Sequence, residues 1–316
     1  MSYARNDVCA IILNWNGAPS TINCLRSLDA HCNVPMVVID NASSDDSVAR
    51  MRQFMDDAAG PEEVRQFDEK TIAQHAERHD RVLIVNEGNY GYAGGNNVGI
   101  EYAMRAGYRY IWLINNDVMV EAGALDGLVA TLEQAPDCGF SASVLVYSDR
   151  PEVVQCVGGG DVFPWLGKTK LLGKNLDRAK LATSRLPEPD YLMGACLLIR
   201  REVIEQVGSM DHRYFMYSEE VDWQRRAAAA GWHHRVASTS FVRHGDSGST
   251  RGRSHMFHYY RNRAAIMYNK RFHSLACTWF SALALSAITV LQNRRSGKNI
   301  RFGIKGITEG LAFRWR

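Results

Sequence analysis

Short apolar runs that end abruptly in polar residues recur along the first 120 positions of the chain. Four of them, at residues 8–14, 36–40, 81–85 and 110–115, are almost continuously hydrophobic. Continuous runs of this length are typical of strands buried on both faces. Segments with apolar residues at helical spacing lie between them. The pattern therefore predicts a β-α-β-α-β-α-β order and an α/β fold with a mostly parallel sheet.

The remaining segments give a less regular pattern. We expect a helix and a surface excursion over 49–80, and a Gly/Asn-rich loop over 86–99 with a helix after it. Residues 157–190 are predicted to be rich in loops. The further elements expected are a helix at 123–134, a strand at 138–148, a strand and a helix within 191–208, and a helix at 218–232 with Ser218 as its N-cap.

Polar side chains follow each of the four predicted strands. They are Asn14, Asp40, the pair Asn86 and Asn89, and the triplet 115–117. Asn and Asp also favour ordinary turns, because they bond to their own backbone. The carboxyl ends of parallel strands meet at one edge of a sheet, where ligands bind in open α/β folds. Four polar strand ends favour a ligand that is rich in hydroxyl groups and base edges.

Composition and cysteine spacing narrow the class of protein. The chain has 316 residues, of which 46% are hydrophobic and 22% charged, an ordinary globular composition. Its seven cysteines form no CxxC pair, which argues against a disulfide framework or a zinc ribbon. We also find no signal-peptide pattern at the N-terminus. These features predict a cytoplasmic protein in a reducing compartment.

Positive charge is concentrated at the C-terminal end. Residues 261–316 hold eleven Lys or Arg and one acid, Glu309, so they carry about +10 while the first 260 residues carry about −7. A basic tail on an acidic body indicates an anionic partner, either nucleic acid or the inner leaflet of a membrane. The charge-free run at 275–291 is shorter than the roughly 20 residues of a spanning helix. We expect a helix that lies in the membrane interface or packs on a partner, which includes a homodimer.

Eight motifs follow one another in the order seen in one enzyme family. They are LNWNG, VVIDNASSDDSV, NYGYAGGNNVGI, WLINNDVMVEAGAL, YLMGACLLIRR, FMYSEEVDWQRRAAAAGW, RHGDSGS and YYRNRA. Over about residues 8–270 the chain resembles family 2 inverting glycosyltransferases, and most of all the rhamnosyltransferase-like branch of bacterial polysaccharide biosynthesis. The resemblance implies a GT-A fold with a Rossmann-like nucleotide-binding half, and a nucleotide-diphosphate sugar donor.

The resemblance also implies a domain division and a metal site. It gives a glycosyltransferase domain over 1–270, with a nucleotide-sugar half at 1–120 and an acceptor and catalytic half at 121–270. A basic amphipathic helical region follows at 271–316. The triplet NND stands at the family's DxD position, so Asp117 and Asn115 are expected to bind Mn²⁺ or Mg²⁺, with His244 completing the site. A hard divalent cation suits the charge of a departing diphosphate.

Three acids at the start of one predicted helix are the candidate catalytic residues. Glu219, Glu220 and Asp222 lie within four positions. Acids in a first helical turn also complement the helix dipole, and Asp222 is placed to pair with Arg226 at i,i+4. In the family's ED motif the second acid, normally Asp, is the general base. The resemblance therefore assigns that role to Glu220, whose side chain is longer by one methylene.

The expected ligand contacts come from several strand ends and loops. The resemblance makes Asp40 the contact for uracil or thymine, with Trp15 available for stacking, while Asn96 is equally suited to cap a helix. The expected nucleotide-sugar contacts are Asn14, Trp15, Asn16, Asp40, Asn89, Gly94, Asn96, Asn97, Asn115, Asn116 and Arg261. The expected acceptor contacts are Gly194, Ala195 and Trp165.

The resulting hypothesis is a hexosyltransferase that is peripheral at the inner face of a bacterial membrane. It transfers a sugar, with L-rhamnose from dTDP-rhamnose as the best match, to a hydroxyl of a lipid-linked or polysaccharide acceptor. Nucleic acid is not an expected partner. Two other classes fit less well: a catalytically inactive glycan-binding relative, and a nucleotidyltransferase that makes an activated sugar. The second would need basic residues near the first strand, where LNWNGAPST has none.

Overall fold

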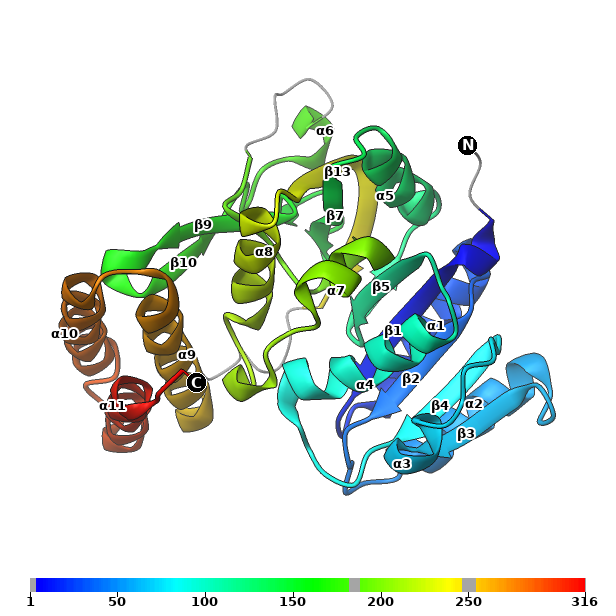
Figure 1. Cartoon of the computed structure of the whole chain (residues 1–316), viewed down its shortest axis with the longest axis horizontal. Coiled ribbons are helices and arrows are strands. Elements are labelled where there is room, and N and C mark those ends of the chain that lie inside the picture. The colour runs from blue at the N-terminus through cyan, green and yellow to red at the C-terminus, as the bar shows by residue number, and fades with distance from the viewer. Residues whose placement is uncertain (1–3, 182–187, 246–253, 316) are drawn as a thin grey trace.

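The computed structural model describes residues 4–181, 188–245 and 254–315, and its centre is one large sheet (Figure 1). Ten strands form this sheet: β1 (Val8–Asn14), β2 (Met36–Asp40), β3 (Val64–Asp68), β4 (Arg81–Val85), β5 (Tyr110–Asn115), β6 (Val118–Val120), β7 (Cys138–Tyr147), β8 (Val154–Cys156), β12 (Cys196–Arg200) and β13 (His233–His244). Their order is β3-β4-β2-β1-β5-β12-β7-β13-β6, and β8 pairs with β7.

The four predicted strands of the N-terminal half are β1, β2, β4 and β5, and they pair in parallel as expected. Asn14 lies opposite Asp40, and Leu13 lies opposite Asn115, so these strand ends are level with one another. β12 runs antiparallel to β5 and to β7, which makes the complete sheet mixed. The register places the polar strand ends at one edge of the parallel part.

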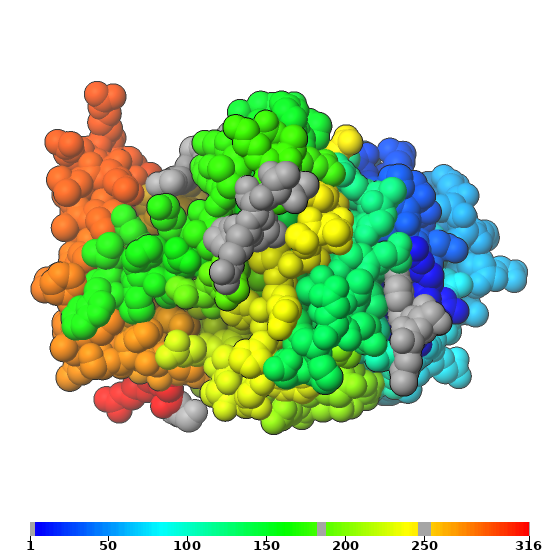
Figure 2. All heavy atoms as spheres, turned by 90° about the horizontal axis from the view of Figure 1, so that it is seen from above, coloured from blue at the N-terminus to red at the C-terminus, as the bar shows by residue number. Residues whose placement is uncertain are grey.

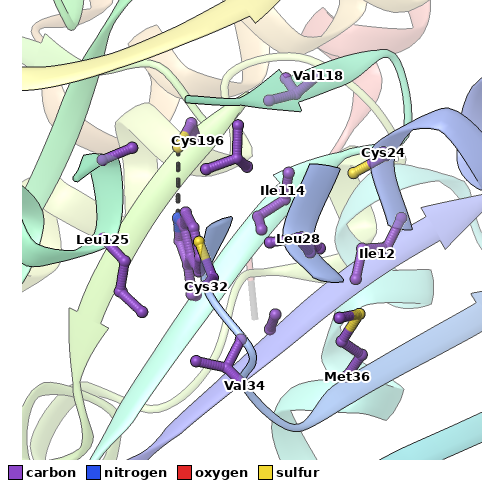
Figure 3. Close-up of a cluster of buried hydrophobic side chains, with 14 of the residues drawn as sticks. Ile12, Cys24, Leu28, Cys32, Val34, Met36, Ile114, Val118, Leu125 and Cys196 are labelled. Atoms are coloured by element: carbon purple, nitrogen blue, oxygen red, sulfur yellow. Dashed lines mark hydrogen bonds between the residues drawn. The ribbon is translucent and has the colours of Figure 1, made fainter. Parts of the chain in front are cut away.

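Helices cover both faces of the sheet. Successive strand residues point to opposite sides, and because both sets are apolar here, both faces are buried against helices. Along β1, Val8, Ala10 and Ile12 join one core cluster, while Cys9 and Ile11 join the other. Figure 3 shows part of the first cluster, in which the Trp112 indole donates to Cys196 Sγ at 3.3 Å. The covering helices are α1 (Ala18–His31), α2 (Ser47–Ala59) and α5 (Ala124–Glu133) on that face, and α4 (Gly91–Arg105), α7 (Arg201–Val207) and α8 (Glu219–Ala229) on the other.

Three segments differ from the sequence prediction. The excursion at 49–80 contains a strand, β3, and a short helix, α3 (Glu69–Ile72). Residues 157–190 contain β9 (Gly159–Phe163) and β10 (Lys168–Leu171), joined by the 3-10 turn η2 (Pro164–Leu166), and these strands form a small antiparallel sheet with β11 (Tyr191–Leu192). Short strands with exposed polar residues lack the apolar runs that identify buried strands. The short helix α6 (Arg178–Leu181) follows β10.

The third difference is the start of α4, which begins at Gly91 rather than after a long loop. Gly91 has φ +70°, and a Cβ there would lie 2.2 Å from the carbonyl oxygen of Phe215. The glycines of this motif therefore serve close packing within a helix. Sequence reasoning placed Gly94, Asn96 and Asn97 in a loop, and the structure places all three on the helix.

The C-terminal chain folds into three helices at one end of the molecule (Figure 1). They are α9 (His255–Phe272), α10 (Leu275–Gln292) and α11 (Gly297–Ala312). The expected boundary at residue 270 falls inside α9. A core cluster joins Ala264 and Met267 of α9 to Tyr214 and Val221, which lie beside the three candidate acids in the sequence, with Trp315 packed against it. The last helices are therefore packed into the same core as the preceding part of the chain rather than appended to it.

Close contact between α11 and α9 depends on a glycine, and this gives a stability prediction. A Cβ on Gly306 would lie 2.2 Å from the backbone oxygen of Tyr259. Gly306→Ala should lower the free energy of unfolding by about 1–3 kcal/mol, because the two helices must move apart. Gly297→Ala in the same helix is the matched control, since nothing lies within 4 Å of its Cβ position. Chemical denaturation should show no loss for the control, and equal stability of both variants would contradict this packing.

Candidate functional site

Buried hydrogen bonds lock the ends of β1 and β2 together. Asn14 and Asp40 are both fully buried, and the Asn14 amide donates to Asp40 Oδ1 at 2.8 Å. The other oxygen of Asp40 accepts from the Ser43 backbone N–H at 2.8 Å, and Thr21 donates to Asn14 Oδ1 at 2.7 Å. Buried polar groups that are fully paired fix one geometry. This network builds the floor of the expected nucleotide site.

The residues that follow Asn14 reach out of this floor. Trp15 is 58% exposed, which is unusual for an indole next to a buried strand end and suits stacking on a planar ligand. Asn16 has φ +51°, and its side-chain oxygen accepts from the Ser44 backbone N–H at 2.8 Å. The structure thus brings these two predicted contacts together with Asp40 at the same edge.

Asn41 organises the start of α4. Its amide donates to Asn89 Oδ1 and to the Gly91 carbonyl, both at 3.0 Å, and its oxygen accepts from the Asn86 side chain at 3.1 Å. Asn89 is exposed beside this group, so its remaining donors face solvent. Sequence reasoning missed Asn41, although its position directly after Asp40 was a signal.

The predicted donor contacts on α4 are engaged inside the protein. Asn96 is buried and its amide donates to the Tyr92 carbonyl at 2.9 Å, one helical turn earlier. Asn97 donates to the Met210 carbonyl at 2.7 Å. Gly94 packs against Tyr90, where a Cβ would lie 2.7 Å from the Tyr90 Cβ. Asn96 does not cap the helix, and these residues support the site by packing.

The NND triplet joins β5 to β6 and faces the end of β13. The backbone N–H of Asn115 donates to the Ala195 carbonyl at 2.9 Å, and the Asn116 amide donates to Thr21 at 3.1 Å. Asp117 Oδ1 lies 3.3 Å from His244 Nε2. The adjacent pairing of His244 with Val118 sets this distance, because it holds β13 against β6.

His244 has the arrangement of a histidine that binds a metal. Its Nδ1 lies 2.6 Å from Gln155 Oε1, which accepts only if that nitrogen carries the proton. The buried Nε2 then offers a bare lone pair toward Asp117, and it has no hydrogen-bond partner among the described residues. Metal-bound histidines typically donate a hydrogen bond from the other ring nitrogen, as Nδ1 does here, and this bond fixes the orientation of the imidazole. Gln155 was missed, because nothing in its sequence context marks it.

Asp117 and His244 therefore fit a divalent cation, as two ligands from the protein. No group of three His, Cys, Asp or Glu suited to a metal occurs within residues 4–181, 188–245 and 254–315. A hard cation accepts oxygen and imidazole ligands, and the remaining positions would be open to a ligand's phosphate oxygens. The rest of the RHGDSGS motif, residues 246–253, lies outside the described part of the chain.

The helix that carries the three acids begins after a strained backbone. Phe215, Tyr217 and Ser218 have φ values of +68°, +71° and +64°, in the left-handed region that non-glycine residues avoid. Residues held in this way cost about 1–3 kcal/mol each and cluster at functional sites. Ser218 stands at the N-cap position of α8 as predicted, but its side chain makes no cap hydrogen bond.

Glu219 and Glu220 form a desolvated pair of carboxyl groups at this helix start. Glu219 is 3% exposed, and Oε2 of each residue is buried with no hydrogen-bond partner in the described chain. Desolvation raises the pKa of Glu220 to about 7. Desolvation and the charge of Glu220 raise the pKa of Glu219 well above its usual range. An unpaired carboxyl group with a pKa near neutral is suited to proton transfer.

Asp222 has a different environment from its two neighbours. It is fully buried, and its oxygens accept from Arg226 at 2.8 Å, Arg271 at 2.7 Å and the Tyr214 hydroxyl at 3.0 Å. The pairing with Arg226 is the one that the i,i+4 spacing predicted. Because both oxygens are occupied by donors, we assign Asp222 to the support of α8 rather than to proton transfer.

The predicted acceptor contacts separate into two places. The Gly194 carbonyl accepts from the Tyr92 hydroxyl at 2.7 Å, and Ala195 bonds to Asn115, so both adjoin the strand-end edge. The charges of Glu219 and Glu220 also act on Tyr92, which places that residue, missed from the sequence, beside the acids. Trp165 instead lies in η2, with its ring 5.7 Å from that of Phe280 on α10.

Arg261 lies on α9, near the start of α8. Its side chain contacts Asn262 at 3.1 Å, and its charge acts on Tyr217. Tyr217 in turn lies within electrostatic reach of Glu219 and Glu220. The structure therefore brings Arg261 into the neighbourhood of the acids.

Solved structures with the same fold include two glycosyltransferases. One is a mannosyltransferase from Pyrobaculum calidifontis in complex with GDP-mannose and Mn²⁺, with a TM-score of 0.56 and 14% identity, covering 98% of this chain and 86% of that one. The other is GalNAc-T7 with UDP, GalNAc and Mn²⁺, with a TM-score of 0.62 and 15% identity, covering 96% of this chain and 56% of that one. The mixed sheet and its covering helices form the GT-A fold, as predicted.

The chain belongs to the glycosyltransferase family 2, whose model (glycosyltransferase like family 2) matches residues 6–269. An N-acetylglucosaminyl-diphospho-decaprenol L-rhamnosyltransferase of Mycobacterium tuberculosis is 30% identical over 198 residues, which are 55% of this chain and 62% of that protein. A low-salt glycan biosynthesis hexosyltransferase of Haloferax volcanii is 24% identical over 193 residues, 60% of each chain. The chain thus spans less than two thirds of the length of these relatives.

The raised pKa of Glu220 predicts how stability depends on pH. The native state holds the Glu220 proton up to about pH 7, while the unfolded chain releases it near pH 4.5, so stability falls as the pH rises between these values. Glu220→Gln removes this loss. The difference in the free energy of unfolding between Glu220→Gln and the unmodified protein should be about 2–3 kcal/mol more favourable to the variant at pH 8 than at pH 5.

Denaturant titrations at the two pH values measure this difference. Glu63→Gln, at an exposed acid in the turn before β3, is the control and should leave the difference unchanged. A Glu220→Gln difference that stays constant from pH 5 to pH 8 would show that Glu220 ionises normally in the folded protein.

Proposed function

We propose that this family 2 member is an inverting, metal-dependent glycosyltransferase that uses Glu220 as its general base. The observation that carries the proposal is the pair of unpartnered carboxyl groups at the start of α8, beside the edge where the four strand ends converge. L-Rhamnose from dTDP-rhamnose is the proposed donor, and a hydroxyl of a lipid-linked or polysaccharide acceptor receives the sugar. The name of the Mycobacterium tuberculosis relative supports both choices.

Trp15 and the neighbouring amides are the proposed nucleotide contacts, with Asp40 as their buried support. Both Asp40 oxygens are engaged, by Asn14 and by Ser43, so the expected direct contact of Asp40 with a pyrimidine edge is not open in this arrangement, while the exposed Trp15 ring offers a stacking surface. Asn16, Asn89, Asn115 and Asn116 add amide groups along the same edge. Arg261 supplies the cationic side chain nearest to this region from α9, which suits a diphosphate.

Inversion requires the acceptor hydroxyl to attack the anomeric carbon from the face opposite the diphosphate. The new carbon–oxygen bond forms as the bond from carbon to the diphosphate oxygen breaks. Glu220 takes the hydroxyl proton on its unpaired Oε2, and its raised pKa makes it an efficient acceptor near neutral pH. Glu219 is more deeply buried, and the charge that forms on Glu220 opposes the ionisation of Glu219.

Asp117 and His244 are the proposed holders of a divalent cation, with Asn115 as a neutral oxygen ligand beside them. Mn²⁺ or Mg²⁺ at this place offsets the negative charge that develops on a departing diphosphate. Gln155 keeps His244 in the tautomer that leaves Nε2 available. Gly194 and Ala195 border the space between this position and Glu220, which suits the acceptor.

A catalytically inactive glycan-binding role is the second candidate, favoured by the single carboxylate in NND. Donor hydrolysis without acceptor, measured with and without manganese, separates the two roles, because an inactive relative binds the donor without cleaving it. We propose a cytoplasmic location at the inner face of a bacterial membrane, where a lipid-linked acceptor is presented. Nucleic acid is not among the proposed partners. A nucleotidyltransferase reaction is not part of the proposal.

The metal assignment predicts the behaviour of two ligand variants. Asp117→Ala should abolish the Mn²⁺-dependent increase in transfer, because it removes the one carboxylate among the proposed ligands, and His244→Ala should weaken the increase, because it removes a neutral ligand. Calorimetric titration of Mn²⁺ in the presence of nucleoside diphosphate measures the loss of binding directly. His233→Ala, at an exposed histidine at the start of the same strand, is the control and should bind normally. Asp117→Ala with undiminished Mn²⁺ affinity would move the site elsewhere.

The base assignment predicts a defined loss of rate. Glu220→Gln keeps the shape of the side chain but cannot accept a proton, so transfer should fall by roughly 10²–10⁴-fold while donor affinity changes little. In the unmodified protein kcat/KM should rise through about pH 7, and this rise should disappear in Glu220→Gln. Glu219→Gln should cost less, and Glu220→Asp tests whether the shorter acid of the family also works. Near-normal transfer by Glu220→Gln would refute the assignment.

A further inference from the structure

Helix α10 presents an apolar side to solvent, unlike an ordinary surface helix. The side that faces the protein combines apolar Cys277, Ala282 and Leu285 with the hydroxyl groups of Thr278, Ser281 and Thr289, and all six residues are buried. The side that faces solvent is apolar along its whole length, and Leu275 and Leu283 are 72% and 70% exposed. The other exposed residues of this face are Ala276, Trp279, Phe280, Ala287, Val290 and Leu291.

Buried hydrogen bonds prevent the helix from turning its apolar side inward. The Asn262 amide donates to the Thr289 hydroxyl at 2.9 Å, and the Asn269 amide donates to the Ser281 hydroxyl at 2.8 Å. Both asparagines on α9 are at most 1% exposed. Rotation or removal of α10 would break both hydrogen bonds, at a cost of about 0.5–1.5 kcal/mol each, and would leave each amide with one other acceptor, the Gly303 carbonyl for Asn262 and the Pro164 carbonyl for Asn269. The outward apolar face is therefore a fixed feature of the fold.

The turn between β9 and β10 extends this face. Phe163, Trp165 and Leu166 are all exposed, and the Trp165 ring lies edge-on to Phe280 of α10, with centroids 5.7 Å apart. Figure 2 shows the two segments side by side at one end of the molecule, in green and orange. Exposed apolar patches that join separate elements mark sites of interaction. Sequence reasoning treated this turn as part of a loop-rich stretch.

Basic residues border the carboxyl end of the patch. Arg294, Arg295, Lys298 and Arg301 are exposed in the turn after α10 and the first part of α11. Glu309 is the only acid between residues 261 and 316, and it pairs with Lys305. Apolar and aromatic side chains beside several cations match the interface of an anionic lipid bilayer.

We propose that the outward face of α10 and the β9–β10 turn together form a docking surface for an anionic lipid bilayer. The helix lies along the membrane, since its other side is hydrogen-bonded to α9 and cannot meet lipid. α10 is the one helix in the described part of the chain that is long and apolar enough to cross a membrane, with a mean hydropathy of 1.6 over 18 residues. A dimer with parallel α10 helices would bring two basic clusters together, which opposes that arrangement, and an antiparallel dimer would leave both clusters without an anionic partner.

This surface does not depend on the catalytic assignment, so its test uses binding instead of activity. The full chain is sedimented with vesicles of phosphatidylcholine containing one third phosphatidylglycerol. Leu283→Glu should weaken vesicle binding at least tenfold, because a carboxylate replaces an apolar side chain that the lipid would cover in the bound state. Arg294→Ala combined with Arg295→Ala should also weaken it by at least tenfold, at about fivefold for each cation.

Two controls match these variants. Leu176→Glu alters an exposed leucine beyond the base of the β9–β10 hairpin, and Arg235→Ala removes an exposed arginine on β13. Both should bind vesicles as the unmodified protein does, and donor-induced thermal shifts should be equal in all variants. Normal binding by Leu283→Glu would overturn the proposal. So would a change from dimer to monomer in Leu283→Glu without loss of vesicle binding, or resistance of the membrane-bound chain to extraction with alkaline carbonate.

Discussion

The buried carboxylate of Asp222 is the interaction on which the rest of this structure depends. A charge with no exposure to water is tolerated only when donors surround it, and here two arginines and a tyrosine do so. Arg226 belongs to the same helix, but Arg271 comes from the end of α9 and also pairs with Asp211 at 3.0 Å. The network therefore ties the helix with the candidate base to the C-terminal helices. Trp315 completes it from the chain end, where its ring covers Arg271 at 4.5 Å.

The same helix is attached on its other side to α4 in the N-terminal half of the chain. The Phe215 carbonyl accepts from the Tyr92 backbone N–H at 2.7 Å, at the first turn of α4, and Gly91 leaves the space for this approach. The cost is the positive φ of three residues in the preceding segment, which the stacking of Phe215 on Tyr260 at 4.5 Å helps to offset. Strain at this point is explained by position: Glu219 and Glu220 must emerge from a helix that is held between two halves of the molecule.

How much of this arrangement the sequence predicts depends on the type of signal. The four parallel strands and their polar ends follow from continuous apolar runs, and register makes Asn14 and Asp40 neighbours without further information. The Asp222–Arg226 pair follows from helical spacing. The role of Gln155 does not follow from the sequence, because Gln155 and His244 are 89 positions apart and only the packing of their strands brings them into contact. Asn96 and Asn97 show the opposite error, since amides in a glycine-rich segment suggest a ligand loop until the helix that contains them is seen.

The basic helices connect the proposed catalytic site and the proposed docking surface within one packed unit. Arg271 of α9 supports α8, which carries the proposed base, and Asn262 and Asn269 of α9 are hydrogen-bonded to α10. α9 is thus hydrogen-bonded both to α8, which carries the proposed base, and to α10, which has the outward apolar face. No flexible linker separates the two within residues 254–315, where α9, α10 and α11 pack on one another. If the face of α10 rests on a bilayer, the strand-end edge is held at a constant height and angle above the lipid. Such a geometry favours an acceptor hydroxyl that is itself fixed to the membrane surface over one that diffuses freely.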